Sequence, residues 1–144
     1  MKTKDFVSKL DDQRIVDAIA EAEKKSSGEI RVYISDDQCE RAVMAAQDQF
    51  LKLGMEKTKR RNGVLIFFAP LSQTFAIVGD QGIHEKCGQP FWEEVRDSMS
   101  EHLKQERFTE AVIVAVGKVG ALLAKYFPPD PDDTDELPNQ VLRG

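Results

Sequence analysis

Two apolar β runs in the middle of the chain constrain its fold more than any other feature. The first lies in residues 61–69 and the second in residues 74–80, and only the four residues from Pro70 to Gln73 separate them. Apolar runs joined by so short a turn predict an antiparallel hairpin that is buried in a sheet. The second run leads directly into residues 79–82, Gly-Asp-Gln-Gly, a flexible corner that carries one carboxylate.

The first part of the chain predicts a helix followed by a strand. Apolar residues recur at helical spacing after Asp11-Asp12, so these aspartates are expected to cap a helix that ends at Gly28, its C′ residue. Apolar and polar residues then alternate over residues 30–35, which predicts a strand with one buried and one exposed face. This strand ends at Asp36-Asp37.

Further helices are predicted on both sides of the hairpin. The one before it covers about residues 39–55, and its apolar stripe consists of Cys39, Val43, Ala46, Phe50 and Leu53. After the hairpin, a short helix at residues 81–87 is closed by Gly88. A long helix then begins with Pro90 in its first turn.

The segment 109–127 admits two interpretations. Residues 111–116 alone suggest a buried strand, yet the apolar pattern continues far beyond them, which is too long for one strand. We therefore favour a buried helix with Thr109 as its N-cap, in which Gly117 and Gly120 allow close backbone packing. Strands that alternate with helices predict an α/β protein: a three-layer α/β/α sandwich with a small mixed β-sheet containing a central hairpin.

Length and charge divide the chain into a body and a tail. Its 144 residues suffice for a single domain with one core, which we place at residues 1–127. Residues 128–144 form an acidic tail with prolines, in which five acids and one base give a local charge of −4. The other 20 acids and 19 bases nearly cancel, so neither part has the basic face that nucleic-acid binding requires.

Export and membrane insertion are not predicted. The first residues contain lysines but no apolar core, so we expect no signal peptide, and no run reaches the length of a transmembrane helix. Cys39 and Cys87 are far apart in sequence and form no CxxC pair, which favours reduced thiols. We therefore expect a cytoplasmic protein; its oligomeric state stays open.

An ordered set of short motifs resembles the TPM-domain family, named for thylakoid lumen, photosystem II repair and levamisole-receptor-associated proteins. The motifs span nearly the whole chain and lie at residues 27–32, at 61–63 with the strand after them, and at 79–84, 91–92, 127–128 and 135–139. None of these motifs alone is specific to the family, but the ordered set of them is. The last two make the chain look like the small cytosolic bacterial branch of the family.

This resemblance carries expectations about fold and activity. It implies the same α/β/α sandwich, and it implies binding of Ca²⁺, because members of the family are described as calcium-binding. Plant members are described as acid phosphatases, whereas most bacterial members have no assigned activity. Exported relatives typically carry Gly-Tyr-Gly-Leu-Glu at the corner after the hairpin. Here His84 stands at the glutamate position, so a metal site does not carry over directly from them.

Four carboxylates are candidate metal ligands. Asp36 and Asp37 follow the first strand, at the carboxyl edge where open α/β sheets usually bind ligands, and adjacent carboxylates in a loop suit calcium. Asp80 is expected at the opposite edge of the sheet, with Glu29 near it. The competing interpretation is that the aspartates only cap the helices that follow them.

A second arrangement would suit a transition metal. Asp80, His84 and Cys87 are spaced i, i+4 and i+7, so a short helix places them on one face. No fourth ligand is visible in the sequence. We therefore favour structural roles, with Asp80 as a cap, Cys87 packed against other residues and His84 on the surface.

These observations support one leading hypothesis and two alternatives. The leading hypothesis is a TPM-like domain that binds calcium through loop carboxylates and acts as a binding or interaction module. The first alternative is a metal-dependent acid phosphatase that uses Asp36, Asp37 or Asp80, although the sequence contains no P-loop, HExxH or Gly-x-Ser-x-Gly motif. The second is a protein partner bound through the acidic tail.

Overall fold

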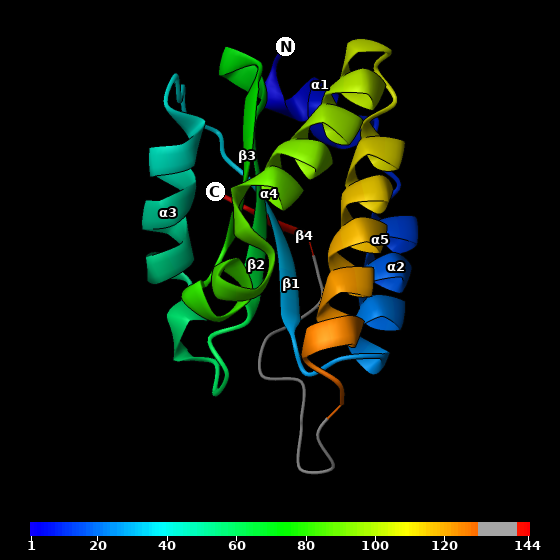
Figure 1. The fold of residues 1–144 in the computed structure, drawn as a ribbon. Helices are drawn as coiled ribbons and strands as arrows, with labels where there is room; N and C mark the ends of the chain where they lie inside the picture. The colour runs from blue at the N-terminus through cyan, green and yellow to red at the C-terminus, as the bar shows by residue number, and fades with distance from the viewer. Residues whose placement is uncertain (130–140) are drawn as a thin grey trace.

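The computed structural model describes residues 1–129 and 141–144, which form a mixed four-stranded sheet with helices on both faces (Figure 1). The strands are β1 (Glu29–Ile34), β2 (Gly63–Ala69), β3 (Thr74–Gly79) and β4 (Val141–Arg143). The helices are α1 (Thr3–Ser8), α2 (Asp12–Lys24), α3 (Ala42–Lys52), α4 (Gln81–Lys104) and α5 (Phe108–Tyr126), and two 3₁₀ turns are η1 (Met55–Lys57) and η2 (Pro70–Ser72). The α/β/α sandwich predicted from the sequence is confirmed.

The predicted hairpin is present and lies at one side of the sheet. Strands follow the order β3-β2-β1-β4, with β2 antiparallel to β3 and β1 parallel to both β2 and β4. The hairpin pairs Ala69 with Thr74 next to the turn and Val64 with Gly79 at its far end. All seven residues of β2 are buried, because helices cover both of its faces.

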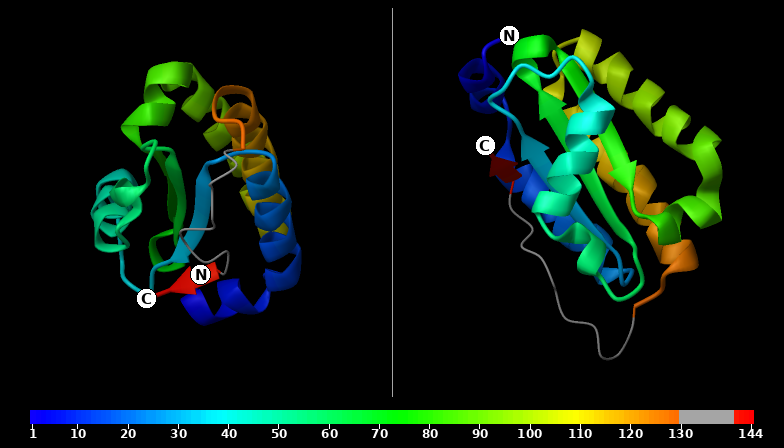
Figure 2. Two further views of the ribbon diagram at one scale, coloured as in Figure 1. Left: turned by 90° about the horizontal axis from the view of Figure 1, so that it is seen from below. Right: turned by 90° about the vertical axis from the view of Figure 1, so that its left-hand side faces the viewer.

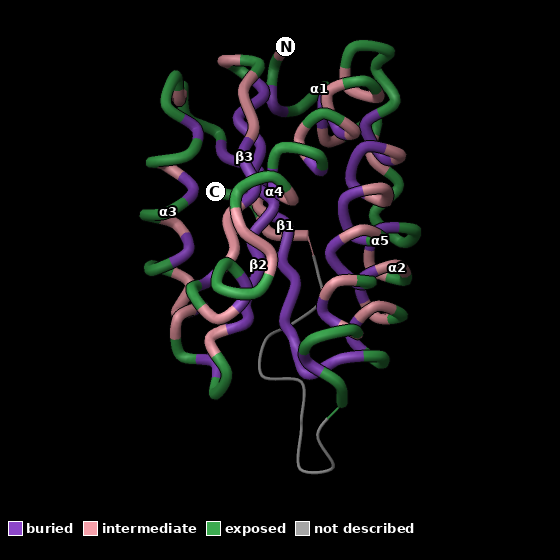
Figure 3. The backbone as a smooth tube through the Cα atoms, viewed as in Figure 1, coloured by how far each residue is buried: buried purple, intermediate pink, exposed green. Residues whose placement is uncertain are grey.

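Two separate cores lie on the two faces of the sheet. Figure 2 shows the helices that cover each face. Alternate residues of β2 point in opposite directions, so Ile66 contacts the core under α2, α4 and α5, whereas Leu65 contacts the core under α3. Figure 3 shows β1 and β2 as a buried strip between helices that are exposed on their outer sides.

The prediction that one face of β1 is exposed is wrong. Arg31, one of its polar residues, is only 6% exposed, and the strand is buried almost throughout. The reason is that β1 has β2 on one side and β4 on the other, so it is an inner strand. A pattern of alternating polar residues cannot reveal polar side chains that are buried together.

The helix before the hairpin is shorter than predicted, and its stripe is shifted. It covers Ala42–Lys52 rather than residues 39–55, and Val43, predicted to face inward, is 47% exposed. The buried residues are Ala42, Ala46 and Phe50, which follow the i, i+4, i+8 spacing of one helix face. Cys39 lies outside the helix because its backbone is held by the hairpin turn: its N–H donates to Ser72 Oγ at 2.8 Å.

Helix α2 begins as predicted, because the Asp11 carboxylate accepts a hydrogen bond from the Arg14 N–H. Its end is different, since Lys25 is the C-cap and Gly28 does not adopt a left-handed conformation. Instead, the side chain of Leu123 on α5 packs closely against the backbone of Gly28, where a Cβ would lie 2.7 Å from it.

The segment 109–127 is a helix, as favoured, but two details differ. The N-cap is Arg107, and the Thr109 hydroxyl accepts a hydrogen bond from the Asp11 N–H at 3.0 Å. Gly120 approaches α2 closely, as expected, whereas a Cβ at Gly117 would meet nothing within 4 Å. Gly117 therefore has no packing role of the predicted kind.

The short helix and the long helix after the hairpin form one element, α4, with a kink. Gly88 has φ 70° and ψ 177°, a left-handed backbone that glycine tolerates and that ends the short helix where predicted. Residues Trp92, Val95 and Met99 of the long part are buried.

Residues 141–143 return to the sheet as strand β4. Val32 pairs with Val141 and Ile34 with Arg143, so the end of the predicted tail belongs to the sheet. The tail acids, Asp130, Asp132, Asp133, Asp135 and Glu136, lie outside the described residues. In the part of the chain that the structure describes, none of the helices has the length and apolarity needed to span a bilayer.

Candidate functional site

The carboxyl end of β1 presents the two adjacent aspartates that the sequence singled out. The backbone here is held firmly: the Ser35 N–H donates to the Phe68 carbonyl at 2.8 Å, and the Asp36 N–H donates to the Gly144 carbonyl at 2.7 Å. The Ser35 hydroxyl accepts from the Asp37 N–H at 3.1 Å. Both aspartates are exposed. A rigid turn therefore displays two carboxylates to solvent.

These two carboxylates differ in their partners. The Asp36 carboxylate accepts a hydrogen bond from Arg143 Nε at 3.2 Å, in an ion pair whose two side chains are each about half exposed. The Asp37 carboxylate makes no hydrogen bond or ion pair with any described residue. Nearby, burial raises the pKa of Tyr33, and the charges of Asp37 and Asp36 raise it further. The turn is thus a region of negative potential that one arginine partly neutralises.

Asp80 lies at the opposite end of the sheet, where its carboxylate is fully engaged. It accepts from Arg61 Nε at 2.7 Å and from a terminal Arg61 nitrogen at 2.8 Å, and it caps α4 by accepting from the Gln81 N–H at 2.8 Å. The Asp80 side chain is 5% exposed. Hydrogen bonding to Asp80 raises the pKa of Arg61. Three charge-assisted hydrogen bonds indicate a structural role.

Gly82 explains why the corner after the hairpin is rich in glycine. A Cβ at this position would lie 2.5 Å from the carbonyl oxygen of Arg60 and 2.6 Å from that of Arg61. The start of α4 therefore presses against the loop that precedes β2, and this contact sets Arg61 opposite Asp80. The predicted corner thus supports the structure through close backbone packing.

Glu29 lies at the same end of the sheet as Asp80, as predicted. Glu29 pairs with Gly63 in the parallel ladder, and the Asp80 N–H donates to the Gly63 carbonyl at 2.9 Å. Glu29 is 4% exposed and belongs to a buried group of charges with Arg31 and Glu23. Burial lowers the pKa of Arg31, and Glu29 and Glu23 oppose that effect.

The four predicted ligands therefore do not converge on one site. The six-residue strand β1 separates Glu29 from the two aspartates at its other end, a distance of roughly 20 Å. Nor do Asp80, His84 and Cys87 form a zinc site: the His84 ring accepts a hydrogen bond from Trp92 Nε1 at 3.3 Å. Among the described residues, no three His, Cys, Asp or Glu side chains form a group able to hold a metal.

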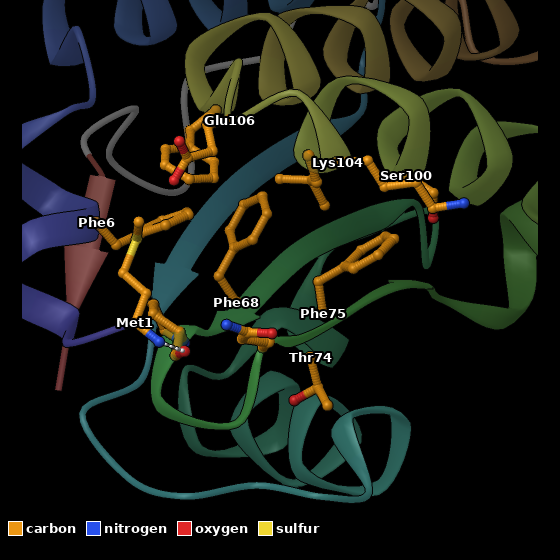
Figure 4. A pocket seen from close by; sticks show the side chains of 12 residues that line it. Met1, Phe6, Phe68, Thr74, Phe75, Ser100, Lys104 and Glu106 are labelled. Carbon is orange, nitrogen blue, oxygen red and sulfur yellow. Dashed lines mark hydrogen bonds between the residues drawn. The ribbon is translucent and has the colours of Figure 1, made fainter.

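Sequence reasoning missed a cavity of about 420 Å³ near the hairpin turn, at the carboxyl end of β2 (Figure 4). Phenylalanines from four elements line it, and Lys104 and Ser100 of α4 stand at its border. Part of this cavity could have been found, because the hairpin register places Phe68 directly opposite Phe75. The remaining walls come from segments distant in sequence.

The family model described as TPM domain matches residues 1–122 of this chain. Among solved structures, the fold is similar to the NMR structure of the BA42 protein from the psychrophilic bacterium Bizionia argentinensis. The two share 42% sequence identity with a TM-score of 0.84, over 92% of this chain and 92% of the other. No curated protein matches the chain significantly. With most of its length matched by the family model and by a solved relative, the chain belongs to the TPM-domain family.

Proposed function

We propose that this TPM domain is a binding module that takes up calcium weakly through Asp36 and Asp37. The observation that carries the proposal is the exposed carboxylate pair at the carboxyl end of β1, where Asp37 has no partner among the described residues. Open α/β sheets usually bind their ligands at this edge. The backbone hydrogen bonds of Ser35 and Asp36 hold the turn in place, so a cation would meet a preformed arrangement.

The expected affinity follows from the number of ligands. Calcium takes six to eight oxygens, and two carboxylates supply at most four of them, so water molecules and backbone carbonyls complete the shell. Sites with few charged ligands bind calcium with dissociation constants of about 0.1–1 mM. Arg143 competes with the cation for Asp36, which weakens binding further.

The other two predicted ligands, Asp80 and Glu29, are less suited to bind calcium. Asp80 already accepts three charge-assisted hydrogen bonds, and a cation there would have to displace Arg61. Glu29 is buried within a group of charged side chains. Calcium binding at that end of the sheet stays a prediction, and the proposal depends on the exposed pair alone.

The test is a calcium titration of ¹⁵N-labelled protein followed by amide chemical shifts. We expect fast-exchange shifts centred on residues 35–38 and 143–144, with saturation at millimolar calcium. Asp37→Asn abolishes them and Asp36→Asn weakens them, whereas Asp97→Asn, which removes an exposed carboxylate from α4, changes nothing. Absence of shifts around Asp36 and Asp37 at 10 mM calcium, taken here as about ten times the weakest expected constant, would overturn the proposal.

No specific observation favours the acid phosphatase alternative over this proposal, so its support is still the family resemblance. A protein partner for the acidic tail is likewise a prediction, because the tail acids lie outside the described residues. We retain the cytoplasm as the proposed location, and the two free cysteines, Cys39 and Cys87, support it.

A further inference from the structure

An aromatic cavity lies between the hairpin and the ends of three helices. Its volume of about 420 Å³ falls within the range of roughly 300–1,000 Å³ that is usual for small-molecule sites. Four phenylalanines line it, each from a different element: Phe6 of α1, Phe68 of β2, Phe75 of β3 and Phe108 of α5. In Figure 4 the rings of Phe6, Phe68 and Phe75 border one common space.

The walls of this cavity hold one another in place. The ring of Phe6 packs against Phe68 and Phe108 at centroid distances of 5.2 and 4.8 Å, and Phe68 packs against Phe75 at 6.3 Å. Phe6, Phe68 and Phe108 are buried, and Phe75 is partly exposed. Each ring of this wall thus packs against at least one other ring of it. A planar apolar ligand would find its binding surface already formed.

Hydrogen-bond donors border the aromatic walls. Lys104 makes no hydrogen bond or ion pair with any residue that the structure describes, and the same holds for the side chains of Ser100 and Gln73. The other polar groups at the cavity are occupied: the Thr74 hydroxyl donates to the Cys39 carbonyl at 2.6 Å. The free groups of the border are therefore an ammonium, a hydroxyl and an amide.

Charge at the border favours an anion. The carboxylate of Glu106 is paired with Lys9 at 3.7 Å, and the Lys9 ammonium also lies 5.9 Å from the centre of the Phe108 ring. Lys104 adds a second cation, and the N-terminal ammonium of Met1, which lines the cavity and donates to the Pro70 carbonyl at 3.3 Å, adds a third. A ligand that brings a negative charge would reduce this positive excess, whereas a cationic ligand would meet repulsion.

We infer that this cavity binds a small aromatic acid, with its ring against the wall that the phenylalanines form and its anionic group against Lys104. The inference does not depend on calcium binding, because it involves neither Asp36 nor Asp37. The aromatic walls provide most of the affinity, and the ammonium distinguishes an acid from a neutral molecule of the same shape.

Two fluorescent probes of nearly the same shape test the charge preference. 1-Anilinonaphthalene-8-sulfonate is an aromatic anion, and N-phenyl-1-naphthylamine has the same ring system without the sulfonate. We expect the folded protein to bind the sulfonate more tightly, and 1-naphthoate to displace it. Amide shifts on adding 1-naphthoate are expected at Phe6, Phe68, Phe75 and Phe108. Equal affinity for the two probes, or shifts elsewhere, would overturn the inference.

Two pairs of variants place the ligand. Ser100→Phe fills the cavity from α4 without removing a core residue and is expected to abolish sulfonate binding, whereas Ser98→Phe on the same helix, outside the cavity lining, leaves it unchanged. Lys104→Gln is expected to weaken sulfonate binding roughly two- to fivefold, the effect of a partly exposed ion pair, with no change for the neutral probe. Lys86→Gln, on the far end of α4, is its control.

The variants are informative even if one of them is unstable. Should Ser100→Phe fail to fold, the Lys104→Gln comparison between the two probes still decides the charge preference. Unchanged binding of the sulfonate to a folded Ser100→Phe protein would contradict the inference, and so would an equal loss for both probes in Lys104→Gln.

Discussion

Carboxylates lie at both ends of the sheet, but they are buried and paired at one end and exposed at the other. At the end where β1 and β2 begin, Asp80 is 5% exposed and bound by Arg61, and Glu29 is buried. At the other end, Asp36 and Asp37 are exposed, and a cavity remains open beside the hairpin turn. A carboxylate at a strand end is therefore accessible to a ligand only where the neighbouring segments do not bury or fully engage it.

Chain connectivity explains the difference. At the first end, the chain leaves β3 and starts α4 against the loop before β2, so close backbone contacts at Gly82 seal this edge. At the second end, the parallel strands β1 and β2 lead into separate segments, one toward α3 and one into the hairpin turn. Diverging connections leave room at the carboxyl edge of a parallel sheet.

The largest contrast is expected in stability. Asp80→Ala removes a helix cap and leaves Arg61 without its partner, so we expect the free energy of unfolding to fall by about 2–3 kcal/mol in urea denaturation. Asp36→Ala should change it by roughly 0.5 kcal/mol or less, since this side chain is about half exposed. Equal losses for the two variants would mean that the ends do not differ as described.

A smaller effect is expected on calcium affinity. Arg143→Gln frees the Asp36 carboxylate while keeping a side chain suited to strand β4, so calcium should bind roughly two- to fivefold more tightly in the amide-shift titration. Arg14→Gln breaks a similarly exposed ion pair with Glu110 and serves as the control, with unchanged affinity. Weaker calcium binding in Arg143→Gln would show that the arginine supports the site instead of competing for it.

The smallest expected effect is on the ionisation of Tyr33. Burial raises its pKa, and Asp37 adds to that, so Asp37→Asn should lower the pKa without returning it to the ordinary value. Ultraviolet titration near 295 nm in a Tyr126→Phe background measures this, because the chain has two tyrosines. An unchanged Tyr33 pKa would place the Asp37 charge farther away than the structure does.

The same shift has a consequence for stability at alkaline pH. The folded-state pKa of Tyr33 is raised, so its stabilising contribution is complete below the unfolded-state pKa of about 10 and is lost as pH rises through the folded-state value. Tyr33→Phe should therefore make the decline of the unfolding free energy above about pH 10 shallower.

Several features of the fold could be predicted because local sequence determines them. The hairpin followed from two apolar runs around a short turn, and the helix at residues 109–127 followed from the length of its apolar pattern. The kink at Gly88 followed from the glycine itself. The prediction that Val43 faces inward was wrong because this helix has two apolar stripes of similar character. Only the contact of the helix with the sheet determines which of the two is buried.

The candidate site was less predictable because it depends on contacts between residues that are distant in sequence. That Asp36 and Asp37 follow a strand was visible, but not that Arg143, over a hundred residues later, would pair with one of them. The cavity combines Phe6 and Phe108 with the hairpin, and no local pattern connects these segments.

The α/β class, the hairpin and the family could all be predicted from the residues, because periodicity and ordered motifs are local properties of the chain. Which carboxylates are occupied, and where a cavity remains, is evident only from the folded chain. The occupancy of the carboxylates and the position of the cavity both depend on which distant segments come into contact at each end of the sheet. Those contacts determine the hydrogen bonds, the burial and the open space there.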